Sequence, residues 1–266
     1  MTPDNEASWD ALAGAYQEHV GWPDDELTWG WRTPPESELR LVSDVVAGAT
    51  TLVLGCGGGQ DLVALARLGA GALTGLDVSS EQLSHARSRL AEAGVAATLV
   101  HADAADLDRF DAGTFDLVVS VQALDYVADV DALVAGVTRI LRPGGVLAFS
   151  VMHPAEAATD DTRPWPWTGS YFEAERDWVW DGLADDDLAF RSWFRSPAAW
   201  FTALTDGGLV VDRLLEPAPV DDRRWIERGW LDEDGYAKLD RVPATILVRA
   251  HRPRPDPGSG PTTAAS

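Results

Sequence analysis

Residues 51–61 read TLVLGCGGGQD, and this stretch decides the fold. An apolar run, a glycine-rich turn and a following segment with helical spacing predict a strand, a loop and a helix. In open α/β sheets such loops lie at the carboxyl ends of strands, where ligands bind. Glycine lets the backbone approach a ligand, and the N–H groups of a helix beginning near Asp61 would point at it.

The glycine spacing separates the candidate cofactors. A dinucleotide fingerprint is G-x-G-x-x-G, whereas here the glycines fall at Gly55, Gly57 and Gly59, and Gln60 occupies the position of the third. A phosphate-binding P-loop is excluded because no Gly-Lys-Ser/Thr follows. The loop alone remains weak evidence, since glycine-rich turns occur in many folds.

Strand-like and helix-like segments alternate around this loop. The expected strands are residues 51–54, 72–78, 97–101, 115–121, 146–152, 209–215 and 245–250. The expected helices are residues 61–68, 79–93, 129–141 and 197–205. Repeated βα units predict an α/β fold with a parallel, doubly wound sheet.

Acidic residues lie at the ends of the next two strands. Asp77 lies 20 positions after Gly57, where a carboxylate accepts hydrogen bonds from ribose hydroxyls. Asp103 could accept from an adenine amino group, with the backbone N–H of Ala104 donating to the ring. The alternatives are a helix N-terminal acid at Asp77 and a turn aspartate at Asp103.

Five ordered segments carry a family resemblance: VLGCGGGQD (53–61), GLDVS (75–79), HADAADL (101–107), FDLVVSVQALDYV (115–127) and LRPGGVLAFSV (141–151). In order and spacing they resemble the class I S-adenosylmethionine-dependent methyltransferases, in the small-molecule branch that serves secondary metabolism. The resemblance implies a Rossmann-like seven-stranded sheet whose last strand, here residues 245–250, is antiparallel. It also implies S-adenosylmethionine as cofactor and S-adenosylhomocysteine as product.

The resemblance adds further residues to the cofactor site. Tyr16 resembles the lid tyrosine that closes over the cofactor, although it could also serve only in the packing of the lid. The expected cofactor-binding residues are Tyr16, Gly55, Cys56, Gly57, Gly59, Gln60, Asp61, Asp77, Val78, Gln82, Asp103, Ala104, Val121 and Gln122. The family usually has an acid two positions before the first glycine, where this chain has Val53. Asp61 or backbone carbonyls of the loop would then hold the amino group of the methionine part.

Methyl transfer mainly needs alignment of the acceptor and exclusion of water, so a strong catalytic residue is not essential. A general base helps when the acceptor loses a proton. His153, after the fifth strand, is one candidate for this base. Its alternative role is structural, as a hydrogen-bonded histidine at the end of the strand. Asp125 is another candidate, because it could orient an amine or hydroxyl. We find no acidic and amide set for a metal ion.

Twelve tryptophans flank the sheet on both sides in the sequence, and none lies in residues 33–164. Such residues line apolar pockets, stack on planar rings or hold cations, although each could equally form the cap's own core. The pattern predicts a hydrophobic or aromatic acceptor, methylated on O, N or C. The expected substrate residues are Trp22, Trp29, Trp165, Trp167, Tyr171 and Trp180.

Composition limits the partners. The net charge of −22 disfavours nucleic acids and anionic membranes. No apolar run could cross a bilayer and the N-terminus does not resemble a secretory signal, so we expect a cytoplasmic protein. Lys238, the only lysine, is interpreted as codon bias and not as a site.

These observations predict five parts: an N-terminal lid (1–35), a cofactor-binding core (36–153), a substrate cap (154–196), the remaining core elements (197–252) and a disordered tail (253–266). Tryptophans of the first segment could form a homodimer contact as easily as a lid. Three other functions stay open. They are a non-methylating cyclisation or rearrangement with the same cofactor, a non-catalytic binding protein, and a nicotinamide dehydrogenase.

Overall fold

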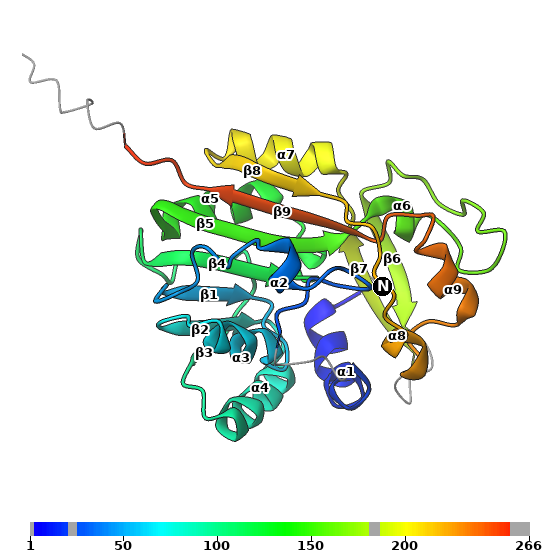
Figure 1. The fold of residues 1–266 in the computed structure, drawn as a ribbon, viewed down its shortest axis with the longest axis horizontal. Coiled ribbons are helices and arrows are strands. Elements are labelled where there is room, and N and C mark those ends of the chain that lie inside the picture. The colour runs from blue at the N-terminus through cyan, green and yellow to red at the C-terminus, as the bar shows by residue number, and fades with distance from the viewer. Residues whose placement is uncertain (1–2, 21–25, 181–186, 256–266) are drawn as a thin grey trace, which may run out of the picture.

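A computed structural model describes residues 3–20, 26–180 and 187–255 (Figure 1). Its centre is a seven-stranded sheet in the order β3-β2-β1-β4-β5-β9-β8. The strands are β1 (Thr51–Leu54), β2 (Leu73–Asp77), β3 (Thr98–His101), β4 (Phe115–Val121), β5 (Leu141–Met152), β8 (Val210–Leu215) and β9 (Thr245–His251).

The pairing confirms the predicted topology. Strands β1 to β5 pair in parallel, whereas β9 runs antiparallel to both β5 and β8. The chain order reverses between β1 and β4, where Val53 pairs with Val119. Ligands of open α/β sheets bind outside the carboxyl ends of the strands at such a reversal. The site is therefore expected beside the loop after β1.

Alternate strand residues build two cores, because successive side chains point to opposite faces of a sheet. Leu52 and Val118 pack on the face covered by α5 (Val130–Ile140) and α7 (Pro197–Asp206). Val53, with Leu117 and Val119, packs on the face covered by α3 (Gln60–Arg67) and α4 (Ser80–Ala93). Burial on both faces explains why β4 is apolar almost throughout.

A second layer lies beyond the carboxyl edge of the sheet, at the right of Figure 1. It contains α1 (Asn5–Val20), α6 (Pro154–Ala157), the hairpin of β6 (Glu175–Trp180) and β7 (Leu188–Trp193), α8 (Arg224–Glu227) and α9 (Glu233–Lys238). The side chain of Asn5 bonds the backbone of Arg191 in β7 in both directions, at 2.8 Å each. Gln17 donates to Gln82 of α4 at 2.7 Å. Helix α1 thus joins the hairpin to the core.

Two features differ from expectation. Strand β5 begins at Leu141, so residues 142–145, expected to end a helix, already belong to the strand. Helices α8 and α9 lie in a range where no helix was predicted. They form a small core of their own with Trp31, centred on Trp225 and Tyr236. The range 197–252 therefore supplies part of the second layer as well as the core. The short α2 (Glu36–Leu39) and the 3-10 helix η1 (Leu124–Tyr126) complete the fold.

Candidate functional site

The loop after β1 has the backbone that its glycines predict. Gly55 has φ +66°, and a Cβ there would lie 2.3 Å from the Cβ of Ala123. Gly57 has φ +49°, and its N–H donates to Oδ2 of Asp77 at 2.7 Å. The other carboxylate oxygen of Asp77 accepts from the N–H of Ser79 at 2.9 Å. Asp77 therefore fixes the loop, and each oxygen keeps lone pairs for a ligand.

A cavity of about 600 Å³ opens beside this loop and is called the cofactor cavity here. Most of the predicted cofactor residues line it: Tyr16, Gly55, Gly57, Gln60, Asp61, Asp77, Val78, Gln82, Asp103, Ala104, Val121 and Gln122. Cys56 and Gly59 are not among its lining residues. Cys56 is buried, and Gly59 backs onto Ala86 of α4, where a Cβ would lie 3.1 Å away. These two residues support the loop from behind.

Asp61 is the residue proposed from the sequence to replace the family's usual acid, and its position can be compared with that of Val53. Val53 is fully buried in the core, whereas Asp61 lines the cofactor cavity with 6% of its surface exposed. Burial raises the pKa of Asp61 to about 7, against a small lowering by Arg89. The neighbouring Oε1 of Gln60 is buried without a partner in the described part of the chain. This acceptor pair fits the ammonium group of a bound amino acid.

A second cavity of about 420 Å³, called the acceptor cavity here, lies next to the first. Both cavities are lined by Trp9, Tyr16, Gln122 and Tyr126, so they meet at these residues. The remaining wall combines aromatic side chains with polar and charged ones. The aromatic residues are Trp31, Trp178, Trp180, Phe194, Trp225 and Trp230, and the charged residues are Asp125, Glu156, Asp161, Arg176 and Lys238. The rings pack edge to face, with Tyr16 and Trp180 at a centroid distance of 5.8 Å.

Backbone strain marks the junction of the two cavities. Gln122 has φ +52°, a conformation that costs free energy for a non-glycine residue. Its N–H donates to the carbonyl of Ser150 at 3.0 Å, and its Nε2 donates to the carbonyl of Trp29 at 3.2 Å. The fold therefore holds this side chain where the two ligands would meet.

Few of the predicted aromatic residues reach the acceptor cavity. Among those in the described ranges, Trp180 alone lines it; Trp22 lies outside these ranges. Trp29 is buried in the core cluster that includes Val53, and its indole N–H donates to Glu36 at 3.1 Å. Trp165 donates to the carbonyl of Asp234, and Trp167 is 59% exposed. Tyr171 packs beside His153 at 6.1 Å.

Three tryptophans of the first segment, those in its described part, face inward. Trp9 and Trp31 line the acceptor cavity, and Trp29 is fully buried. The sequence pattern missed Trp9, Trp31, Tyr126, Trp178, Trp225 and Trp230 as cavity residues. Trp9 and Tyr126 lie close to predicted site residues, which is the one local signal that could have indicated them.

His153 is 3% exposed and lies at the N-terminus of α6, where its Nδ1 accepts from the N–H of Ala155 at 3.0 Å. Its Nε2 bonds Oε1 of Glu216 at 2.8 Å. Burial lowers the pKa of this imidazole, although Glu216 partly offsets the effect. His153 lines neither cavity, and both ring nitrogens are engaged. This geometry favours the structural alternative over a catalytic base.

Asp125 has a different environment. It is 4% exposed, lies in η1 directly after β4 and lines the acceptor cavity. One carboxylate oxygen accepts from the N–H of Met152 at 2.8 Å. The other is buried without a partner in the described ranges. Burial raises the pKa of this group to about 7, with Met152 and Arg195 opposing the shift.

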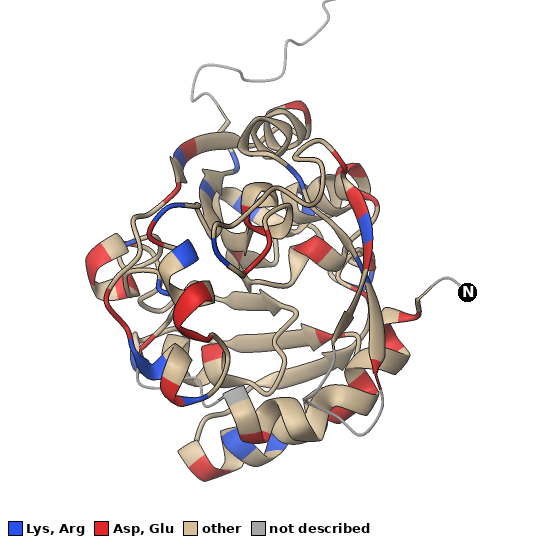
Figure 2. Cartoon of the chain, turned by 90° about the vertical axis from the view of Figure 1, so that its right-hand side faces the viewer, with Lys and Arg blue, Asp and Glu red and all other residues tan. Residues whose placement is uncertain are grey.

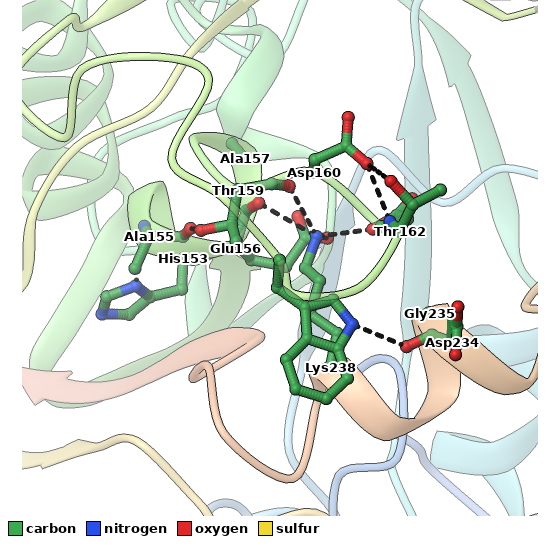
Figure 3. A network of polar contacts seen from close by, with 12 residues as sticks. His153, Ala155, Glu156, Ala157, Thr159, Asp160, Thr162, Asp234, Gly235 and Lys238 are labelled. Atoms are coloured by element: carbon green, nitrogen blue, oxygen red, sulfur yellow. Dashed lines mark hydrogen bonds and ion pairs between the residues drawn. The ribbon is translucent and has the colours of Figure 1, made fainter.

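Lys238, interpreted from the sequence as codon bias and not as a site, lines the acceptor cavity, and its ammonium group lies in a network of polar contacts (Figure 3). Its side chain is 1% exposed. The ammonium group donates to Glu156 Oε1 at 2.9 Å, to the carbonyl of Thr159 at 2.9 Å and to Asp161 Oδ1 at 2.6 Å. A fourth, longer contact of 3.3 Å joins it to the carbonyl of Glu156, so its donors are saturated and the group belongs to a structural ion network.

The sequence and the fold of this chain were compared with those of known proteins. The methyltransferase domain family matches residues 52–149. The crystal structure of an S-adenosylmethionine-dependent methyltransferase from Mesorhizobium loti is 31% identical, with a TM-score of 0.64 over 81% of this chain and 96% of that one. The chain belongs to the class I S-adenosylmethionine-dependent methyltransferases. The cofactor of this methyltransferase is therefore S-adenosylmethionine.

Curated relatives of this methyltransferase include the ubiquinone biosynthesis O-methyltransferase of Methylococcus capsulatus. It is 34% identical over 137 residues, which are 51% of this chain and 57% of that protein. This chain spans about half the length of the curated relatives it matches. The cyclase SpnF shares the fold at 17% identity, with a TM-score of 0.65 over 96% of this chain and 99% of that one.

Proposed function

We propose that this methyltransferase transfers a methyl group to an O, N or C atom of a small hydrophobic or aromatic metabolite. The observation that carries the proposal is the shared wall of the two cavities, formed by Trp9, Tyr16, Gln122 and Tyr126. A methyl donor in one cavity and an acceptor in the other would meet there. The relative that is named an O-methyltransferase supports oxygen as one acceptor atom.

The residues of the chain have separable roles in this proposal. When bound, S-adenosylmethionine supplies a methyl group on a positively charged sulfur. Asp77, Asp103 and the glycine loop would hold the adenosine part, and Asp61 with Gln60 the ammonium group. The aromatic wall would align the acceptor and exclude water, which is the main requirement of an in-line displacement.

The charge distribution supports a small molecule as acceptor. Acidic positions are spread over the side of the molecule that carries the second layer, with basic residues between them (Figure 2). With the net charge of −22, this surface would repel a phosphate backbone. In the described ranges, the structure has no helix that is both long and apolar enough to cross a bilayer.

Replacing Trp180 with alanine tests the acceptor cavity. Trp180 contacts Trp9, Tyr16 and Trp230 there, so its loss should lower kcat/KM by about 10–100-fold through lost apolar contact. Affinity for S-adenosylhomocysteine should stay unchanged, because Trp180 does not line the cofactor cavity. The assay follows S-adenosylhomocysteine formation over a panel of phenols, alcohols and amines.

Trp167→Ala is the matched control, since this tryptophan is in the same part of the chain but is 59% exposed and lines neither cavity. It should retain wild-type kcat/KM within twofold. Equal losses in both variants would contradict the placement of the acceptor. Acceptor turnover without S-adenosylhomocysteine would favour the non-methylating alternative, and cofactor binding without turnover the non-catalytic one.

A further inference from the structure

The carboxylate of Asp125 has an unusual position for a buried acid. Its Oδ1 is buried without a partner in the described ranges, while its Oδ2 accepts one backbone N–H. A buried acceptor left without a hydrogen bond costs free energy, so native structures rarely keep one without a reason. The residue lines the acceptor cavity, and a ligand that donates a hydrogen bond would satisfy it.

No basic side chain in the described ranges donates a hydrogen bond to Oδ1 of Asp125. Arg195 is the basic group whose charge acts on Asp125, but its guanidinium donates to the carbonyls of Val127 and Ala128 at 2.8 Å each. Lys238 also lines the cavity, but its ammonium group is saturated by Glu156, Thr159 and Asp161. The other titratable or charged groups facing the cavity are Tyr16, Tyr126, Glu156, Asp161 and Arg176.

Asp125 also lies beside the junction of the cavities. Its neighbours Gln122 and Tyr126 line both cavities, so its carboxylate is next to the place where the methyl group would cross. Burial and the charge of Asp125 raise the pKa of Tyr126 well above its usual value, which keeps that phenol neutral. Asp125 is thus the group beside this junction that can accept a proton near neutral pH.

We propose that Asp125 is a catalytic residue that binds the protic group of the acceptor and receives its proton. This inference rests on the proposed function and narrows the acceptor to an oxygen or nitrogen that carries hydrogen. A lone pair of that atom forms the bond to the methyl carbon. The carbon–sulfur bond breaks with its electron pair left on sulfur, and the O–H or N–H proton passes to Oδ1 of Asp125. The pKa of about 7 suits a base at neutral pH.

The test is Asp125→Asn, which keeps an oxygen for the N–H of Met152. General-base catalysis typically contributes about 100–10,000-fold, so kcat/KM for phenols, alcohols or amines should fall by that factor. Wild-type kcat/KM should rise with pH through about 7, as the carboxylate ionises, and the variant should lose this rise. Affinity for S-adenosylhomocysteine should stay within twofold. The exposed Asp131→Asn is the control for the change in charge.

A second measurement does not need an acceptor. Burial raises the folded-state pKa of Asp125 above the unfolded value, so stability falls as the pH rises from about 4 to about 7. Asp125→Asn should therefore unfold at the same or a higher temperature than wild type at pH 8. Retained kcat/KM across this pH range, or marked destabilisation at pH 8, would overturn the inference. A wild-type protein that binds the cofactor but methylates nothing would refute the proposed function instead.

Discussion

Lys238→Met should lower the free energy of unfolding by about 3–5 kcal/mol, because it removes one partner of a buried ion network. The side chain of Glu156 is 9% exposed and would keep a buried charge without its cation. Burial already raises the pKa of Glu156, and Lys238 opposes that shift. Urea unfolding at pH 7 measures the loss directly.

Two controls accompany this measurement. The double variant Glu156→Gln with Lys238→Met removes the stranded charge and should recover part of the loss. Arg223→Met breaks the exposed ion pair with Glu233 and should have a much smaller effect on the free energy of unfolding, because solvent screens such a pair. Equal, small effects of Lys238→Met and Arg223→Met would mean that the network is not structurally important.

Asp61→Asn should weaken S-adenosylhomocysteine binding by about 10–100-fold, the usual value of a charge-assisted hydrogen bond. Only the ionised carboxylate attracts an ammonium group, and burial raises the pKa of Asp61 to about 7 in the free protein. Wild-type affinity should therefore increase as the pH rises through about 7, and the variant should not show this increase. Calorimetric titration between pH 6 and 8 measures both.

The control ligand is 5′-methylthioadenosine, which carries the adenosine and the sulfur but no amino acid. Its affinity should be the same for wild type and Asp61→Asn. A parallel loss for both ligands would indicate damage to the whole cavity. Unchanged affinity for both would show that the amino group is held elsewhere, for example by carbonyls of the loop.

The core could be predicted because short stretches of neighbouring residues determine its strands and its glycine loop. The apolar runs 51–54 and 115–121 predicted β1 and β4 with the bounds that the structure has. Asp77 and Asp103 could be placed because Asp77 ends β2 and Asp103 follows β3 at the same edge of a parallel sheet, and both line the cofactor cavity. The backbone of the loop could also be predicted, because glycine readily adopts the positive φ angles that the loop has.

The second layer was not predictable, because long-range packing decides it. Lys238 is bonded to residues 77–82 positions earlier, which no local pattern contains. Tryptophan clustering did not separate Trp180, which lines the cavity, from the exposed Trp167. His153 lies at a strand end as expected, but its partner Glu216 comes from a distant segment.

Helix α1 forms part of the wall of both cavities. Trp9 and Tyr16 from this helix line both cavities, and the helix is bonded to β7 at one end and to α4 at the other. Whichever ligand arrives first would immobilise the same helix and spare the second ligand that entropic cost. Such heterotropic coupling is reciprocal, so each ligand should tighten the other by an equal factor.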